Sequence, residues 1–396
     1  PPPTIAPAEI AGAIQRGVTL LVERQETYVT KADANAKTAA DAPPREWPYQ
    51  GVHRDPRGEI PIGYRIGGTS IAASALIEVA QRPLAPEVAS ALERSLAFVL
   101  AALGDPEMTP EFETGYDTRG WGHAYGLSFL LALRAAELVP AAQKKDVDAA
   151  VAKLVRVLAD TEIGARGGWN YSRPEGDDSA PSTFMTAPTL QILFEAKRQG
   201  EAVDARVVER ALKTLEDARL ETGAFQYGTN PERRSGQGFE AVMGATGRMA
   251  VCESTLYLAG RSTLERVRGA VDAFFAHWEW LELRRKQNGT HVAPYMIAPY
   301  YFYYAHRYVA QAIELLPAGE KPEYRRKLAQ FLWRTREEDG GWNDRVFPRS
   351  EAYGTAMTLL ALHAPQAAQP ATWGDVTLGS PKGPKPKPGG AKAGAR

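Results

Sequence analysis

The chain has 396 residues, of which 44% are hydrophobic and 24% are charged. This composition excludes disorder over most of the length and allows a large buried core. Lys plus Arg and Asp plus Glu both total 47, so no net charge favours a nucleic acid or an anionic membrane as partner.

Three features of the sequence bear on the cellular location of the protein. No apolar run reaches the ~18 to 20 residues that a membrane-spanning helix needs, so we predict a soluble protein without a transmembrane segment. The single cysteine, Cys252, forbids an internal disulfide but leaves the compartment open. The chain starts with a proline-rich stretch, residues 1–7, rather than with Met, which is typical of a trimmed leader and favours export over a cytoplasmic location. The sequence indicates no cofactor and leaves the oligomeric state open.

Helical periodicity dominates the chain. Apolar residues recur at three- and four-residue spacing in twelve segments, without competing strand alternation. In chain order, the predicted helices are 10–22, 70–81, 88–103, 125–138, 147–158, 186–196, 205–220, 249–258, 264–283, 301–316, 324–336 and 353–363.

A segment rich in glycine and aromatic residues precedes every second predicted helix. It occurs at 63–68, 115–122, 167–171, 223–228 and 340–343, with a looser member at 294–299. The helices that follow are predicted to begin near 68, 122, 180, 246, 299 and 352. This period of about 50 to 65 residues is typical of a repeat architecture with six repeats.

The two kinds of helix predict two concentric rings. Helices after the glycine-rich segments carry many small residues, as at 69–74, which suits close packing in an inner ring. The others carry more Lys, Arg and Glu, which suits an outer ring. We therefore predict one all-α (α/α)6 toroid at 55–367. It follows an N-terminal extension with the first outer helix at 1–54, and a disordered tail rich in Pro, Gly and Lys follows it at 368–396.

The sequence Gly-Gly-Trp-Asn occurs twice, at Gly167–Asn170 and Gly340–Asn343, each time before an inner helix. This motif and the repeat spacing resemble the prenyltransferase and squalene-cyclase repeats of the terpenoid cyclase and protein prenyltransferase superfamily. The segment Glu351–Met357 is similar to bacterial single-toroid members with no assigned reaction. The resemblance implies a central cavity that binds, or cyclises, an isoprenoid or another apolar ligand.

The resemblance also implies candidate acids. Class II triterpene cyclases carry Asp-x-Asp-Asp-Thr-Ala, whose central aspartate protonates an alkene or epoxide, and this chain has Glu-Gly-Asp-Asp-Ser-Ala at 175–180. Adjacent carboxyl groups split their pKa values, which makes one of them a proton donor. Glu175, Asp177 and Asp178 are therefore the predicted catalytic residues. Asp and Ser are also preferred N-cap residues, so the simpler interpretation is that 177–179 only start the inner helix.

Protein prenyltransferases of the same superfamily bind zinc through Asp, Cys and His. Here Cys252 lacks the Asp-x-Cys spacing, and no His occupies the start of the sixth inner helix. We therefore predict no metal site and interpret Cys252 as a small buried hydrophobic residue.

Six inner-helix N-termini are predicted to converge on one mouth, made positive by the helix dipoles. The predicted ligand-binding residues are Trp121, His123, Tyr125, Trp169, Tyr171, Arg248, Tyr295, Tyr300 and Tyr353.

Two other functions stay open beside the isoprenoid ligand. His123 and Tyr125, near Asp117 and Arg119, suit an acid–base cluster, and aromatic platforms stack on sugars. This favours a carbohydrate-active (α/α)6 lyase or hydrolase, for which an open groove beside His123 is expected. The second alternative is a non-catalytic binding or scaffold toroid.

Overall fold

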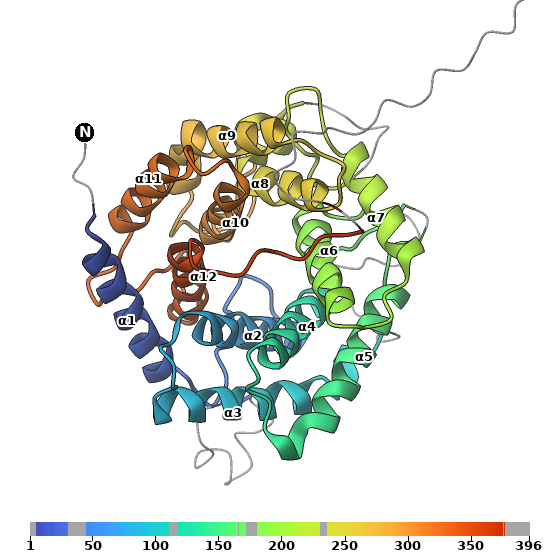
Figure 1. The fold of residues 1–396 in the computed structure, drawn as a ribbon, viewed down its shortest axis with the longest axis vertical. Helices are drawn as coiled ribbons and strands as arrows, with labels where there is room; N and C mark the ends of the chain where they lie inside the picture. Colours follow the sequence, from blue (N-terminus) through green and yellow to red (C-terminus); the bar gives the residue numbers. More distant parts are fainter. Residues whose placement is uncertain are drawn as a thin grey trace, which may run out of the picture.

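The computed structural model describes residues 5–30, 45–110, 118–164, 166–171, 180–229, 236–374 and 376. In these residues twelve α-helices alternate between an outer and an inner ring (Figure 1). The outer ring consists of α1 (Pro7–Glu23), α3 (Pro86–Ala102), α5 (Lys144–Asp160), α7 (Ala205–Asp217), α9 (Leu264–Glu282) and α11 (Lys321–Arg334). The inner ring consists of α2 (Ile62–Val79), α4 (Arg119–Ala135), α6 (Thr183–Arg198), α8 (Val242–Leu258), α10 (Tyr301–Leu315) and α12 (Glu351–His363). The predicted all-α toroid is confirmed.

Burial separates the two rings as the sequence pattern predicts. In the inner helix α8 every residue from Gly244 to Leu258 is buried. The outer helix α7 instead buries one stripe at helical spacing, including Val208, Leu212 and Leu215, and turns its charged face to water. None of the helices described here combines the length and the apolar character needed to cross a bilayer.

Helix α2 begins at Ile62, so the glycine-rich segment 63–68 lies inside the helix rather than before it. The cause is close packing between inner helices. A Cβ atom on Gly63 would lie 2.2 Å from the carbonyl oxygen of Thr118, and one on Gly67 would lie 2.3 Å from the ring of Trp121. These two glycines therefore permit α2 and α4 to approach each other, and they do not form a turn.

Tryptophan joins neighbouring repeats in the same way at three places. The indole N–H donates to a leucine carbonyl near the end of the preceding outer helix, at 2.7 to 2.9 Å, and the backbone N–H donates to a threonine hydroxyl of the following inner helix, at 2.9 to 3.0 Å. The sets are Trp47 with Leu21 and Thr69, Trp169 with Leu158 and Thr186, and Trp342 with Leu332 and Thr355. The repeated motif therefore serves mainly to pack neighbouring repeats against each other.

Gly354→Ala is expected to destabilise the fold by about 1–3 kcal/mol, because the added methyl group overpacks this contact. A Cβ on Gly354 in α12 would lie 2.4 Å from the carbonyl oxygen of Trp342. The matched control is Gly269→Ala in the outer helix α9, where no atom lies within 4 Å of the added Cβ. That change is expected to stabilise by about 0.5–1 kcal/mol. Thermal unfolding measures both, and equal melting temperatures for the two variants would contradict the packing argument.

The first and last repeats meet and close the ring. Helix α1 lies between α11 and α3 (Figure 1). It packs on α12, where a Cβ on Gly17 would lie 2.6 Å from Leu359. Arg24 pairs with both Asp339 and Glu351. The toroid is therefore held shut by apolar and charged contacts between its ends.

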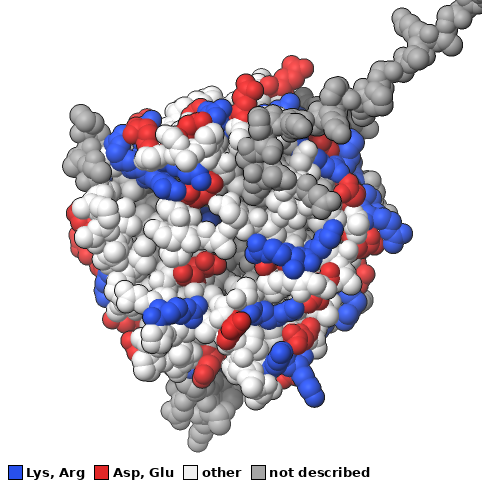
Figure 2. All heavy atoms as spheres, in the orientation of Figure 1, with Lys and Arg blue, Asp and Glu red and all other residues white. Residues whose placement is uncertain are grey.

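The segment after α12 crosses the C-terminal ends of the inner helices (Figure 1). Its Trp373 stacks on Phe194 with ring centroids 5.6 Å apart, and the Lys197 ammonium lies 3.9 Å from the Trp373 ring. The sequence placed the start of a disordered tail at residue 368, whereas Trp373 is packed; residues 377–396 lie outside the described residues. On this face Figure 2 shows Lys and Arg interspersed with Asp and Glu, as the zero net charge implies.

Candidate functional site

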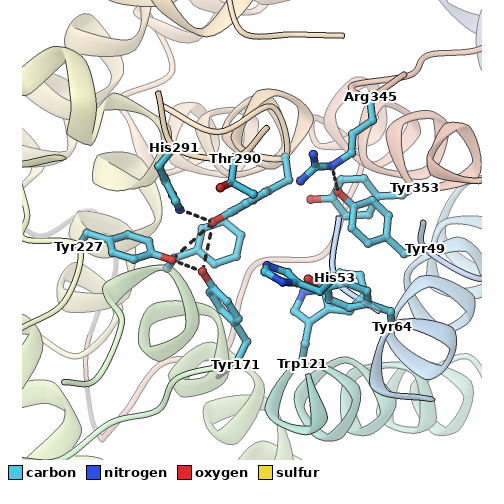
Figure 3. Close-up of a pocket in the computed structure, with 12 residues that line it drawn as sticks. Tyr49, His53, Tyr64, Trp121, Tyr171, Tyr227, Thr290, His291, Arg345 and Tyr353 are labelled. Carbon is cyan, nitrogen blue, oxygen red and sulfur yellow. Dashed lines mark hydrogen bonds between the residues drawn. The ribbon is translucent and has the colours of Figure 1, made fainter. Parts of the chain in front are cut away.

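A cavity of about 230 Å³ lies at the N-terminal ends of the inner helices (Figure 3). Five inner helices each supply one aromatic ring from the first turn or the N-cap: Tyr64, Trp121, Phe184, Tyr300 and Tyr353. Loops complete the wall with Tyr49, His53, Tyr171, Tyr227, Thr290, His291 and Arg345. Eight of the twelve lining side chains are Tyr, Trp or Phe, so the wall is mainly aromatic.

One side of the cavity holds three tyrosines and a histidine in a hydrogen-bonded cluster (Figure 3). The Tyr300 hydroxyl lies 3.3 Å from that of Tyr171, 3.4 Å from that of Tyr227 and 3.1 Å from Nε2 of His291. Nδ1 of His291 lies 2.8 Å from the carbonyl oxygen of Met296. Because a carbonyl only accepts, Nδ1 carries the proton of the neutral ring, and Nε2 accepts from the Tyr300 hydroxyl.

His291, Tyr227 and Tyr300 of this cluster are uncharged at neutral pH. Burial lowers the pKa of His291, and the positive charges of Arg248, Arg345 and Arg284 lower it further, against a hydrogen bond to Met296 that raises it. Burial, reinforced by Tyr227, raises the pKa of Tyr300 well above the ordinary value for a phenol. A neutral imidazole behind a neutral phenol can accept a proton from the cavity through the phenol.

The opposite side of the cavity is cationic. Arg345 is only 3% exposed. Its Nε donates to the Tyr49 hydroxyl at 3.1 Å and its Nη1 to the Gly289 carbonyl at 3.4 Å, and the guanidinium carbon lies 5.5 Å from the centroid of the Tyr300 ring. In the part of the chain that the structure describes, Arg345 forms no ion pair.

Asp344 is fully buried beside Arg345, and neither of its carboxyl oxygens has a hydrogen-bond partner in another described residue. Burial raises the pKa of Asp344 to about 7, although the charges of Arg345 and Arg285 and its own backbone N–H act in the opposite direction. A large fraction of Asp344 is therefore protonated at neutral pH, and it neutralises Arg345 only in part.

Four of the nine predicted ligand-binding residues line the cavity: Trp121, Tyr171, Tyr300 and Tyr353. His123 instead faces a separate hollow between α3 and α5, with Nε2 2.9 Å from the Met108 carbonyl. The Tyr125 hydroxyl lies 3.5 Å from that of Tyr308, deeper in the ring. Because Asp117 lies outside the described residues, the acid–base cluster predicted around His123 is not assembled by the residues described here.

Three further predicted residues support the fold near the cavity rather than line it. Trp169 donates its indole N–H to Leu158, as described above. Tyr295 packs edge-on against Trp280, with centroids 4.6 Å apart. Arg248 is fully buried and donates to three backbone carbonyls, those of Gly244, Phe225 and Phe239.

The predicted acids Glu175, Asp177 and Asp178 lie outside the described residues. The start of the inner helix is described: α6 begins at Thr183 after the N-cap Ser182. The interpretation that 177–179 cap this helix is therefore wrong, because the helix starts four residues after 179.

Sequence reasoning did not assign eight of the lining residues to the site. Tyr64 and Tyr227 belong to the glycine- and aromatic-rich segments, and Arg345 follows the second Gly-Gly-Trp-Asn by two positions. Extending the search to every residue of these segments and to the loops after them would have found these three. Tyr49 follows Trp47 by two positions, as Tyr171 follows Trp169 and Tyr227 follows Phe225, so this spacing would have found it too. His53 and Thr290 stand in stretches with no repeated pattern, and Phe184 and His291 carry no local signal of a site.

No group of three or more His, Cys, Asp and Glu side chains that could hold a metal ion occurs among the described residues. Cys252 is free and fully buried, and burial raises the pKa of its thiol. This surrounding suits the role of a small hydrophobic residue.

No protein-family profile and no curated protein sequence matches the chain. Among solved structures, the type II terpene cyclase MstE from Scytonema, in complex with its substrate geranylgeranyl dihydroxybenzoate, has a TM-score of 0.51 at 12% identity over 90% of this chain and 98% of that one. Cellobiose 2-epimerase from Spirochaeta thermophila has a TM-score of 0.52 at 11% identity over 76% and 86%. The Lin0763 protein from Listeria innocua has a TM-score of 0.51 at 13% identity over 89% and 96%. The likeness is one of fold, and it agrees with the toroid that the repeats predict.

Proposed function

We propose that the chain is a terpene-cyclase-like enzyme that binds an isoprenoid or another largely apolar ligand in its mouth cavity and isomerises it by proton transfer. One observation carries the proposal: the hydrogen-bonded pair Tyr300–His291 stands in an otherwise aromatic wall. The aromatic rings supply the apolar contact, and the pair supplies a site that accepts a proton.

The cavity limits the size of the ligand part that it encloses. A cavity of about 150 Å³ holds benzene, so 230 Å³ corresponds to on the order of ten non-hydrogen atoms. The enclosed part is therefore one ring or about two isoprene units. The complex of MstE with geranylgeranyl dihydroxybenzoate is an example of one toroid of this fold that takes an isoprenoid-bearing substrate.

Cyclisation of this kind needs an acid, a wall and a base. An acid adds a proton to an alkene, aromatic faces stabilise the carbocation that results, and loss of a proton from a neighbouring carbon yields an isomer of the substrate. Tyr300 and His291 suit the last step, since the phenol oxygen accepts this proton while its own proton passes to Nε2.

The first step needs a stronger acid than the described wall holds. Burial raises the pKa of Tyr300 and of Tyr227 well above the ordinary value, and His291 is neutral, so none of these groups protonates an alkene. We assign that step to Asp177, which matches the central aspartate of the motif, with Asp178 and Glu175 as the carboxyl groups that tune it. This assignment rests on the sequence match and on the position of 175–178 a few residues after Tyr171, which lines the cavity.

A carbohydrate ligand is the second candidate. It is favoured by the one-ring size of the cavity together with the phenol and imidazole groups, because aromatic faces stack on sugars and such groups serve acid–base chemistry on them. The hollow that His123 faces between α3 and α5 adds no support, because His123 is buried and its Nε2 is bonded to the Met108 carbonyl.

The experiment that separates these functions is a fluorescence titration. Trp121 lines the cavity, so a ligand bound there changes its emission. Geraniol is expected to cause a saturable change that Trp121→Phe largely removes, whereas glucose and cellobiose cause none. Saturation by a sugar and not by geraniol would move the assignment to the carbohydrate enzyme. A protein that responds to neither would lack the proposed function.

A further inference from the structure

We propose that the ligand carries a carboxylate and that Arg345 binds it in the wall of the mouth cavity. This inference rests on the proposed function and narrows its ligand to an acid with an apolar body. The inference concerns recognition of the ligand, whereas Tyr300 and His291 are proposed to accept the proton that the carbocation loses.

The first step of the argument is the unfilled bonding capacity of Arg345. A guanidinium has five N–H donors in a planar fork. Two of its nitrogens have acceptors, the Tyr49 hydroxyl and the Gly289 carbonyl, and Nη2 has none among the described residues. Nη2 is also absent from the set of enclosed polar atoms without a partner, so it is accessible from the cavity, beside which Figure 3 shows the guanidinium.

The second step is the missing counter-charge. The twelve side chains of the wall include no Asp or Glu. Asp344 is adjacent in sequence, but its carboxyl group lies beyond ion-pair distance of the Arg345 guanidinium. Burying a cation without an ion-pair partner costs free energy of folding. The partner that suits the planar fork of a guanidinium best is a carboxylate, which accepts two parallel N–H bonds.

Further positive charge surrounds the mouth. The charges of Arg345 and Arg54 add to burial in lowering the pKa of His53 to about 4, and those of Arg248 and Arg284 act on His291. In the described part of the chain, these four arginines donate to carbonyl and hydroxyl oxygens and form no ion pair. The N-terminal ends of five inner helices add their dipoles. The mouth therefore attracts an anion.

The proposed chemistry gives a third reason. A guanidinium in the wall that is neutralised only in part opposes a carbocation in the same cavity, because like charges repel strongly where water is scarce. A carboxylate on the ligand that pairs with Arg345 removes this opposition. The ion pair between Arg345 and the ligand carboxylate then both recognises the acid group and stabilises the carbocation.

The test uses one apolar body with three head groups: geraniol, geranate and geranyl phosphate, with dissociation constants measured by calorimetry. The wild-type protein is expected to bind geranate about 10- to 100-fold more tightly than geraniol, as a charge-assisted hydrogen bond predicts. Arg345→Gln is expected to reduce this ratio to about threefold or less, and Arg345→Lys to keep part of it, because the charge remains without the fork. The matched control is Arg268→Gln, which removes a cation of the outer helix α9 that pairs with Glu320 and does not line the cavity, and it is expected to keep the ratio.

Several results would overturn the inference. Equal affinity of the wild-type protein for geranate and geraniol, unchanged in Arg345→Gln, would reject the carboxylate and leave the proposed function intact. Tighter binding of geranyl phosphate than of geranate would assign Arg345 to a phosphate group instead. If none of the three probes bound, the proposed function would fail together with this inference. Circular dichroism of Arg345→Gln and Arg345→Lys separates lost recognition from lost folding.

Discussion

Asp344→Asn is expected to stabilise the protein at pH 8 and to leave its stability nearly unchanged at pH 3. Burial raises the pKa of Asp344 from an ordinary value of 3.8 to about 7 in the folded chain. The folded state therefore prefers the protonated carboxyl group, and stability falls as the pH rises from about 4 to about 7. Above pH 7 the full cost applies, about 4 kcal/mol for a shift of this size. Asparagine has a similar shape and never ionises, so it removes this cost.

The groups that face Asp344 do not reverse the expected loss of stability with rising pH. They are Arg345 in the same loop, Arg285 after α9, Tyr49, Tyr303 in α10 and Tyr353 in α12. The two arginines attract the carboxylate, and their effect is already part of the pKa near 7. The tyrosines stay neutral because burial raises their pKa values.

Melting temperatures of wild type and Asp344→Asn between pH 3 and pH 8 measure this effect. The control is Asp339→Asn in the same loop, for which the expected change in stability at pH 8 has the opposite sign. Burial acts to raise the pKa of Asp339, but hydrogen bonds from the Gly341 N–H and from Arg24 outweigh it and lower the pKa. The ionised Asp339 carboxylate therefore stabilises the folded protein above about pH 4, and this stabilisation is lost on acidification. Asp339→Asn is expected to destabilise the protein at pH 8. A lower melting temperature of Asp344→Asn at pH 8 would contradict the argument.

Asp177→Asn is expected to lower the turnover of an isoprenoid acid by about 10²- to 10⁴-fold, the usual contribution of a general acid. Affinity for the substrate should change by about threefold or less, because Arg345 and the aromatic wall are intact. Gas chromatography with mass spectrometry measures the product, and calorimetry measures the affinity.

The informative comparison is Tyr300→Phe, which breaks the path to His291 at the other end of the reaction. This variant should still consume substrate, but its products should include alcohols formed by capture of the cation by water. If Asp177→Asn kept full turnover while Tyr300→Phe abolished it, the reaction would start with proton abstraction, and the acid role of Asp177 would be wrong.

The sequence was informative about the fold because the helical signal is long and repeated. An outer helix such as α7 carries its apolar residues at the period of 3.6, the inner helices recur with the glycine- and aromatic-rich segments, and the predicted order of twelve helices agrees with the structure. The start of α2 was missed because the glycine-rich segment 63–68 was placed before the helix, whereas Gly63 and Gly67 lie inside it and permit contact with Thr118 and Trp121. Contacts between distant segments leave no periodic mark in a single sequence.

The site was predictable where it coincides with a helix start or with a Gly-Gly-Trp segment. Trp121 and Tyr353 stand in first turns, and Tyr171 follows Trp169 of the first Gly-Gly-Trp-Asn by two positions. His123 follows Trp121 by two positions, which turns it about 200° around α4 and toward α3 and α5. Tyr125 follows by four positions and shares the face of Trp121, but it lies one turn, about 6 Å, below the mouth. Arg345 and Tyr49 come from loops nearly 300 residues apart, and their hydrogen bond depends on closure of the ring.

Closure of the ring has a consequence for the order in which the protein is made. Helix α1 is synthesised before the other eleven helices, yet it packs on α12, which follows more than 300 residues later. Until then α1 has no permanent partner on that side, and Arg24 lacks Asp339 and Glu351. Contacts of such long sequence separation form slowly and leave apolar surface open in the meantime. Nascent chains of this protein are therefore expected to depend on chaperones until the sixth repeat has emerged.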